Sequence, residues 1–427
     1  MPSALRSEEP VGISATRGKR VACLAALACM GFAFLHCEKS PVSTQPAEQA
    51  VFTPALSATN AEVRGFLAKG QGGTHAKLVY IDRTLAPERL CYLDFSETGE
   101  KPAVHVISAA NQPEVPVISP DGNWVVYASG DGTEAGSALT ARSSIYLARL
   151  SEDAQPMLLA ADSACEPRFV QNVQGKLSVI YATLDPDLAW QGHGQTRRID
   201  IDISGAQPVA SPAQVVWAKG GYSAGLSWDN RYLSAGGGLV ARLDLLGAKQ
   251  APDTLAYNMV QACNASASSS RIFTNTLMYL NTDGIDPKIN GGKEWGEWQA
   301  ILIGDSSKSL LKGYTCPATF ANPIETEPKS FTTMRWHHPE WSNHPYFAAA
   351  TLNVDRFFKS GSGYANTGYQ ERIYLLNLKD STYLEVVRPD AVRFTGKSFD
   401  ASGFYWPWLW VEVPEGFQEA ADWLAPK

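Results

Sequence analysis

Three histidines, two tryptophans and one glutamate fall within the nine residues from Trp336 to His344. Imidazoles can bind a metal or donate hydrogen bonds, and indoles offer flat apolar faces to a ligand. His337 and His338 are adjacent, so on a strand they would point to opposite faces and could not easily share one metal ion. We therefore predict a ligand-binding loop, with simple packing as the alternative. The predicted ligand-binding residues are Trp295, Trp298, Trp336, His337, His338 and His344.

A second stretch imitates a catalytic motif. Gly221 to Gly225 fits the G-x-S-x-G pattern, in which a strand-to-helix turn exposes a nucleophilic serine. The residues from Leu226 onward are typical of a strand, so Ser223 is expected in a glycine-rich loop. The stretch 281–286 has oxygen-bearing side chains but lacks the first aspartate and the final glutamate of a calcium loop. We predict no enzyme, no cofactor and no metal site.

The elements that would position these residues repeat along the chain. Ser119-Pro120-Asp121-Gly122 has the residues of a tight turn, and an apolar strand-like run follows it. Leu226–Leu233 matches Ile118–Val125 position by position, at a spacing of 108 residues, and Ile180–Thr183 matches Val126–Ser129 at a spacing of 54. Repeat units of about 45–55 residues with two or more strands each indicate propeller blades.

We therefore predict an all-β fold, a single β-propeller of about six blades (five to seven) over residues 71–415. The composition suits this fold, because the chain has 44% hydrophobic residues, 35 glycines and 26 prolines. The aromatic run at 404–410 is expected to close the ring, with residues 406–413 pairing with the first blade around residues 78–95. An exposed aromatic platform is the alternative for this run.

The repeat also carries a family resemblance. The Ser119-Pro120-Asp121-Gly122 turn, the apolar strand after it and the Ile145-Tyr146-Leu147 strand resemble the WD40-like (PD40) repeat of TolB-type β-propellers, over residues 75–390. The resemblance implies a scaffold that recognises an envelope protein. In general layout the chain is also similar to an uncharacterised paralogous lipoprotein family of fibre-degrading rumen bacteria.

The N-terminus indicates export. Arg17, Lys19 and Arg20 precede an uncharged run at 21–35, which is typical of a secretory signal and too short for a transmembrane helix. Cys37 follows this run, and we predict that it is acylated, with plain cleavage and secretion as the alternative. We assign residues 1–37 to the signal, 38–70 to a flexible tether and 416–427 to a C-terminal tail.

Charge and cysteine content limit the partners and the compartment. The net charge of −7, with no basic cluster beyond the N-terminus, argues against nucleic acid. Four cysteines remain outside the leader, and an exported chain with four could form one or two disulfides; free buried thiols are the alternative. The disulfide candidates are Cys91, Cys165, Cys263 and Cys316.

These observations predict a non-catalytic, lipid-anchored protein of the cell envelope whose propeller binds another protein. It would be a monomer attached to the outer membrane. The alternative is a carbohydrate-binding propeller that uses aromatic platforms, and a hydrolase is the third class. The expected partner is accordingly an envelope protein or a glycan.

Overall fold

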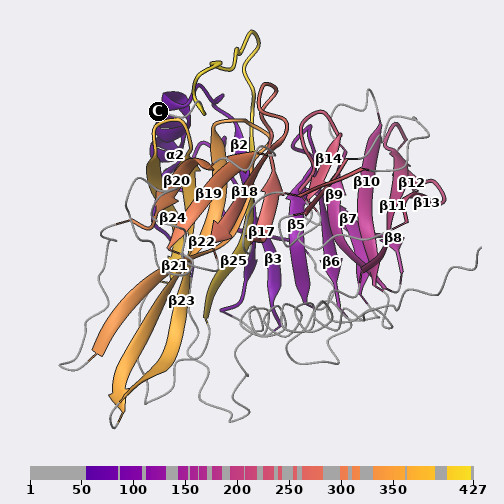
Figure 1. Ribbon diagram of the computed structural model, residues 1–427. Coiled ribbons are helices and arrows are strands. Elements are labelled where there is room, and N and C mark those ends of the chain that lie inside the picture. The colour runs from indigo at the N-terminus through magenta and orange to yellow at the C-terminus, as the bar shows by residue number, and fades with distance from the viewer. Residues whose placement is uncertain are drawn as a thin grey trace, which may run out of the picture. The chain divides into compact units, whose positions relative to one another are not determined.

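The structure is a computed structural model, and the regular elements among its described residues are almost entirely strands (Figure 1). Among them are twenty-five strands and one helix, so the all-β prediction is confirmed. The described residues are 54–84, 87–107, 112–130, 143–151, 154–161, 163–170, 176–184, 193–205, 207–218, 225–234, 239–242, 253–256, 262–281, 299–305, 310–317, 330–360, 363–389 and 402–424.

Groups of consecutive antiparallel strands make up the fold. One sheet has β5 (Pro113–Ile118), β6 (Trp124–Ser129), β7 (Ser144–Arg149) and β8 (Met157–Ala160) in that order. The next has β9 (Ala164–Phe169), β10 (Leu177–Leu184), β11 (His193–Asp202) and β12 (Val209–Ala210), with β13 (Gln214–Trp217) also on β11. A third sheet has β14 (Tyr232–Ser234), β15 (Leu239–Arg242) and β16 (Asp253–Ala256). A fourth has β17 (Ala262–Ala267), β18 (Thr276–Asn281), β19 (Ala300–Asp305) and β20 (Leu310–Thr315).

The fifth sheet has nine strands and combines the two ends of the described chain. One half is β21 (Ser330–Trp341), β22 (Phe347–Ser360), β23 (Gly363–Asn377) and β24 (Thr382–Pro389), with β1 (Pro54–Leu56) on β24. The other half is β25 (Ser402–Val411), β2 (Ala76–Asp82), β3 (Arg89–Asp94) and β4 (His105–Ile107). A short parallel pairing of Glu371 with Gly403 joins the halves, and a side chain at 403 would collide with Glu371.

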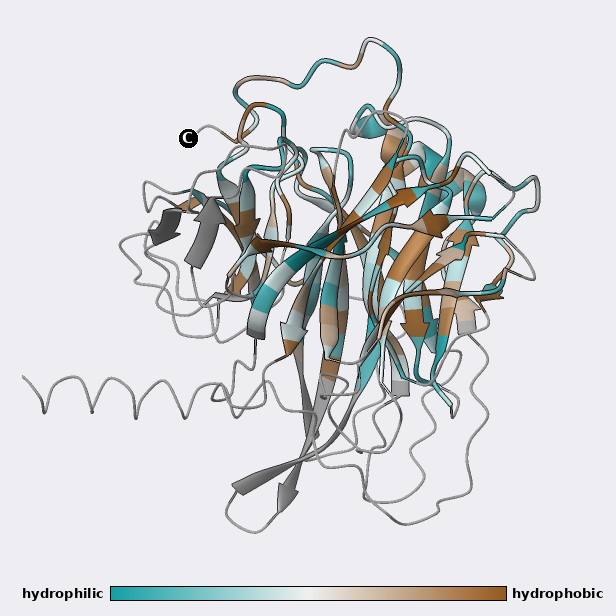
Figure 2. Ribbon diagram, turned by 90° about the vertical axis from the view of Figure 1, so that its right-hand side faces the viewer, coloured by the Kyte–Doolittle hydropathy of each residue, from teal (hydrophilic) through white to brown (hydrophobic). Residues whose placement is uncertain are grey.

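The predicted pairing of the chain ends is confirmed. β25 runs antiparallel to β2, with Ala76 opposite Val411 and Leu78 opposite Leu409. Both strands are rich in β-branched and aromatic residues, and their central side chains are buried. Hydrophobic residues lie mainly on the strands in Figure 2. Pairing the last strand, β25, with β2 removes a sheet edge that would otherwise be open to aggregation.

The repeated turn motif has the same hydrogen bonds in two copies. In the first, Oγ of Ser119 accepts from the backbone nitrogen of Trp124 at 3.0 Å. In the second, Oγ of Ser227 accepts from the backbone nitrogen of Tyr232 at 2.9 Å. Gly122 has φ +74° and Asn230, which replaces it, has φ +60°; asparagine tolerates this left-handed conformation better than most residues.

The ends of the chain carry more structure than the sequence analysis assigned. Residues 38–70 were expected to be a flexible tether, but α2 (Asn60–Lys69) and β1 lie inside this range. Thr59 and Glu62 form a reciprocal capping box that begins the helix, and β1 pairs with β24. The expected tail also packs, because Trp423 and Leu424 are buried in the core. In the described part of the chain, no helix has the length and apolarity needed to cross a membrane.

Candidate functional site

The predicted binding residues at 336–344 lie on a strand and a turn and do not form one loop. Trp336, His337 and His338 belong to β21, whereas His344 lies in the turn between β21 and β22. His344 is therefore separated from the other three residues by the end of β21. Trp295 and Trp298 are outside the described residues, so their predicted role stays a prediction. Ser223 is outside them as well.

Trp336 and His344 are core residues, which corrects their assignment to a ligand. Both are fully buried. The Trp336 ring packs edge-on against Tyr374, with ring centroids 5.8 Å apart. Nδ1 of His344 accepts a hydrogen bond from the backbone nitrogen of Tyr346 at 3.3 Å, and burial lowers the pKa of His344 to about 3. The contacts of both rings are therefore contacts within the packed interior.

A repeated irregularity sets the geometry of the remaining histidines. We use "leading strands" for β5, β9, β17, β21 and β25, which each come at the start of one of the strand series given above. Each has one residue with positive φ, where its register with the neighbouring strand shifts. These residues are Val115, Glu166, Asn264, His338 and Trp406, and proline follows all but Asn264. Such bulges redirect side chains.

The bulges of β21 and β25 bring His338 and Tyr405 together. Nε2 of His338 and the hydroxyl oxygen of Tyr405 are 2.8 Å apart, within hydrogen-bonding distance. The His338 ring also lies 4.2 Å from the Tyr405 ring and 4.2 Å from the Trp406 ring, centroid to centroid. His338 is buried, but Tyr405 is partly exposed. The pair is therefore held rigidly and has one member that a ligand can meet.

Arg83 extends this cluster toward β23. Its guanidinium carbon lies 3.4 Å from the centre of the Tyr405 ring, and its Nη1 lies 3.4 Å from Oε1 of Glu371. A cation over an aromatic face is attracted by the ring electrons, more strongly where water is excluded. Both Arg83 and Glu371 are buried, so their charges act on the cluster with little solvent screening. Neither residue could be identified from sequence spacing, because both are distant from His338 along the chain.

A buried ion pair joins β21 to another leading strand, β9. Nη2 of Arg168 in β9 lies 2.8 Å from Oε1 of Glu340 in β21, and Nε1 of Trp406 donates to the same oxygen at 3.3 Å. Burial raises the pKa of Glu340, and the Arg168 charge opposes that shift. Strands from the two halves of the chain are thus joined by one carboxylate. The repeated residue-proline pairs are a sequence signal that could have identified these positions.

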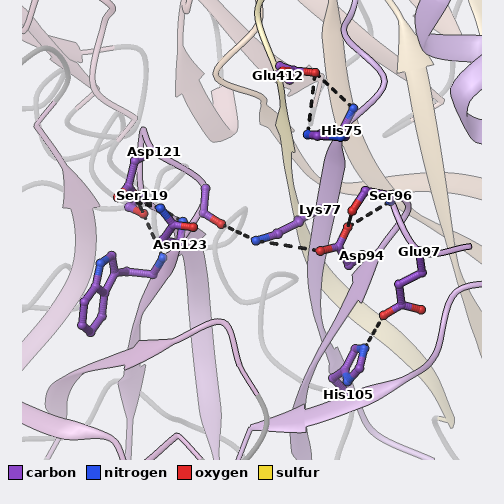
Figure 3. A network of polar contacts seen from close by, with 12 residues as sticks. His75, Lys77, Asp94, Ser96, Glu97, His105, Ser119, Asp121, Asn123 and Glu412 are labelled. Carbon is purple, nitrogen blue, oxygen red and sulfur yellow. Dashed lines mark hydrogen bonds and ion pairs between the residues drawn. The ribbon is translucent and has the colours of Figure 1, made fainter.

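A second polar network lies at the other end of the leading strands (Figure 3). Nζ of Lys77 donates to the backbone oxygen of Gly122 at 2.9 Å and lies 3.9 Å from Oδ2 of Asp94. Nε2 of His105 is 2.6 Å from Oε1 of Glu97. The Lys77 contacts fasten β2 to its neighbours, the His105 contact fastens β4 to the turn after β3, and the groups satisfy one another. We therefore assign this network to the fold and place the candidate site around His338 and Tyr405.

The cysteine prediction is corrected for three of the four candidates. Cys91, Cys165 and Cys316 are free thiols. Burial raises the pKa of Cys91 and of Cys316 to about 12, and burial next to Glu166 raises that of Cys165, so none is a thiolate near neutral pH. The side chain of Cys263 lies outside what the structure describes. Within the described residues, no three histidine, cysteine or acidic side chains are grouped so that they could hold a metal ion.

No protein-family model and no curated protein matches the chain. Solved structures are similar at low identity. A putative 6-phosphogluconolactonase from Bacteroides uniformis is 11% identical with a TM-score of 0.39, and the match covers 75% of this chain and 99% of that one. Another putative 6-phosphogluconolactonase, from Bacteroides fragilis, is 10% identical with a TM-score of 0.40, and the match covers 77% of this chain and 97% of that one. Puromycin hydrolase is 13% identical with a TM-score of 0.38, and the match covers 74% of this chain and 44% of that one.

The expectation that the protein is not an enzyme is contradicted by these comparisons. Two of the similar structures are named for a lactonase and one for a hydrolase, so the exclusion of enzymes is withdrawn. Neither activity is transferred to this chain at such identities. The exclusion depended on motifs in the linear sequence, whereas the fold brings tyrosine, histidine and charged side chains together from distant strands.

Proposed function

We propose that the protein is an exported β-propeller of the TolB-like kind, with about six blades. The repeated groups of antiparallel strands, the two matching serine turns and the pairing of β25 with β2 support this proposal. Contacts between leading strands support it further, since Arg168 of β9 reaches Glu340 of β21. The resemblance of the turn and strand motif to TolB-type repeats is the reason for the family assignment.

The function we propose is the binding of a small polar ligand at the His338–Tyr405 cluster. The observation that carries it is the hydrogen bond between a buried, strained histidine and a partly exposed tyrosine, from two bulged strands. Positive φ at a bulky residue costs about 1–3 kcal/mol and is concentrated at functional sites. Mostly buried side chains suit a small molecule better than a protein surface, which would need exposed contacts.

One expectation from the sequence, the acylation of Cys37, is retained in this proposal. Acylation of Cys37 would attach the protein to the outer membrane, so that the ligand is met in the cell envelope. For the aromatic-platform alternative, Trp336, Trp341, Trp406 and Trp408 are buried, Trp410 is partly exposed, and Trp295 and Trp298 lie outside the described residues. An envelope protein remains an outcome that the experiment can distinguish.

The test uses the mature chain and an envelope extract separated into small-molecule, protein and polysaccharide fractions. The small-molecule fraction is expected to raise the melting temperature of the natural chain and to have no effect on Tyr405→Phe, which lacks the hydroxyl facing His338. Tyr146→Phe in β7 is the matched control and should respond like the natural chain. Stabilisation by the protein or polysaccharide fraction alone, or an equal response of Tyr405→Phe, would reject the small-ligand proposal.

A further inference from the structure

One face of β21, β22 and β23 presents a row of polar side chains next to the His338–Tyr405 cluster. The strand register places Arg335 opposite Asn353, and Asn353 opposite Glu371. Two residues farther along β21, His337 lies opposite Thr351. Residues two apart on a strand share a face, so these five side chains lie on the same side of the sheet. The sheet interior would normally carry apolar residues at such positions.

Two of these buried side chains have oxygen atoms without partners. Oγ1 of Thr351 and Oδ1 of Asn353 have no hydrogen-bond partner among the described residues. Thr351 is fully buried and Asn353 is 5% exposed. Buried polar groups in native proteins are almost always paired with protein, water or a ligand. The two oxygens therefore require a hydrogen-bonding group that the described side chains do not supply, and an amide or carbonyl oxygen requires a donor.

Two arginines and the Glu371 carboxylate, which is paired with Arg83, bring charge to this face. Arg335 and His337 are partly exposed, and Arg83 is fixed close by through Glu371 and the Tyr405 ring. Burial lowers the pKa of His337 to about 3, and the charges of Arg335 and Arg83 lower it further. The imidazole is therefore neutral near pH 7, and it experiences a positive local potential. An arginine guanidinium matches a carboxylate in shape and charge.

We propose that this face binds the hydroxycarboxylate part of a small ligand. Arg335 would contact the ligand carboxylate, assisted by His337. The ligand hydroxyl would donate a hydrogen bond to Oδ1 of Asn353 and form a second one with the hydroxyl of Thr351. This inference rests on the proposed function, because it specifies the chemistry of a ligand at the same cluster. Two groups of residues would have separate roles. Arg335 would set the affinity for the carboxylate, and the unpaired oxygens of Thr351 and Asn353 would select for the hydroxyl.

The test is a nuclear magnetic resonance titration of the mature chain with three probes, namely glycolate, acetate and ethylene glycol. Six of the chain's 7 histidines lie beyond the signal, so imidazole labelling of the mature chain gives a resolvable spectrum. Glycolate is expected to shift the His337 resonance saturably, acetate to do so with at least tenfold weaker affinity, and ethylene glycol to have no effect. Absence of a glycolate shift at His337, or equal affinity for glycolate and acetate, would overturn the proposal.

Variants separate the two contributions. Arg335→Met should weaken glycolate and acetate alike by at least tenfold, whereas Arg198→Met, which removes an arginine on β11, should leave both affinities unchanged. Thr351→Val keeps the side-chain shape and should abolish the preference for glycolate over acetate. A Thr351→Val chain that retains this preference would show that the orphan hydroxyl has no part in binding. An envelope fraction that still stabilises the natural chain while glycolate fails to bind would reject this inference and leave the proposed function standing.

Discussion

Burial of individual histidines should make the stability of the protein depend on pH. The pKa of His344 is lowered to about 3 in the folded chain, mainly by burial, from an ordinary value near 6.5. The unfolded chain therefore takes up more protons than the folded chain as the pH falls through that window. Stability from this group is complete above pH 6.5 and is lost progressively below it, by about 2 kcal/mol between pH 7 and pH 5.

Substitution of His344 isolates this contribution. His344→Gln should be less stable than the natural chain at pH 7, because it disturbs a fully buried turn, but its free energy of unfolding should fall less between pH 7 and pH 5. Urea unfolding at the two pH values measures the difference. His75→Gln is the control, since the His75 side chain is 62% exposed. A His344→Gln chain with the same pH dependence as the natural chain would contradict the assigned cause.

At the same scale, the sequence identified some chemically important residues without showing how they are used. His337 and His338 do belong to a polar cluster, but His344 lies beyond the end of β21 and serves a turn. Residue spacing could not separate these cases, because a loop and a strand containing a proline have similar composition. Arg83 and Glu371 could not be found in this way, since they meet Tyr405 only through long-range strand pairing.

The elements of the fold were more accessible to sequence reasoning, because turn chemistry is local. Ser119 to Gly122 and the copy at Ser227 were predicted as turns and have matching hydrogen bonds. Helix α2 was missed, although Thr59 and Glu62 provide the capping-box signal that precedes it. The bulges were missed because a positive φ at Val115 or Trp406 follows from contacts between strands and not from residue preference.

The turn between β5 and β6 should be locked by its contact with β25. Gly122 has φ +74°, and a Cβ atom there would lie 2.6 Å from the Trp410 ring. Trp410 also donates through Nε1 to the backbone oxygen of Pro120 at 2.9 Å. Gly122→Ala should therefore combine backbone strain of about 1–2 kcal/mol with a steric penalty of about 1–3 kcal/mol.

A second glycine separates these two effects. Gly416 has φ +76°, but a Cβ atom there would meet nothing within 4 Å. Gly416→Ala should show the backbone strain alone, so chemical unfolding should rank Gly122→Ala as the less stable variant by about 1–3 kcal/mol. Equal losses in the two variants would mean that the Trp410 contact does not lock the turn.

For the whole molecule, stability should depend on the pairing between the last strand, β25, and β2. β25 pairs with β2 along most of its length, and Leu409 and Val411 are buried in the main core. Residues after β25 make a separate contribution, because the Trp423 ring lies 5.2 Å from the Tyr346 ring and 6.3 Å from the Trp341 ring. Two truncations can therefore remove the tail alone or the tail together with the closing strand.

A chain ending at residue 411 keeps β25 and should remain soluble, with a lower melting temperature because burial of Trp423 and Leu424 is lost. A chain ending at residue 402 also loses β25, which exposes the edge of β2 and leaves the buried side chains of that strand uncovered. That chain should be insoluble or protease-sensitive and should show no cooperative melting transition. If it melts like the full chain, then the pairing of β25 with β2 is not what holds the two ends of the fold together, and their join must depend on β1 and α2 instead.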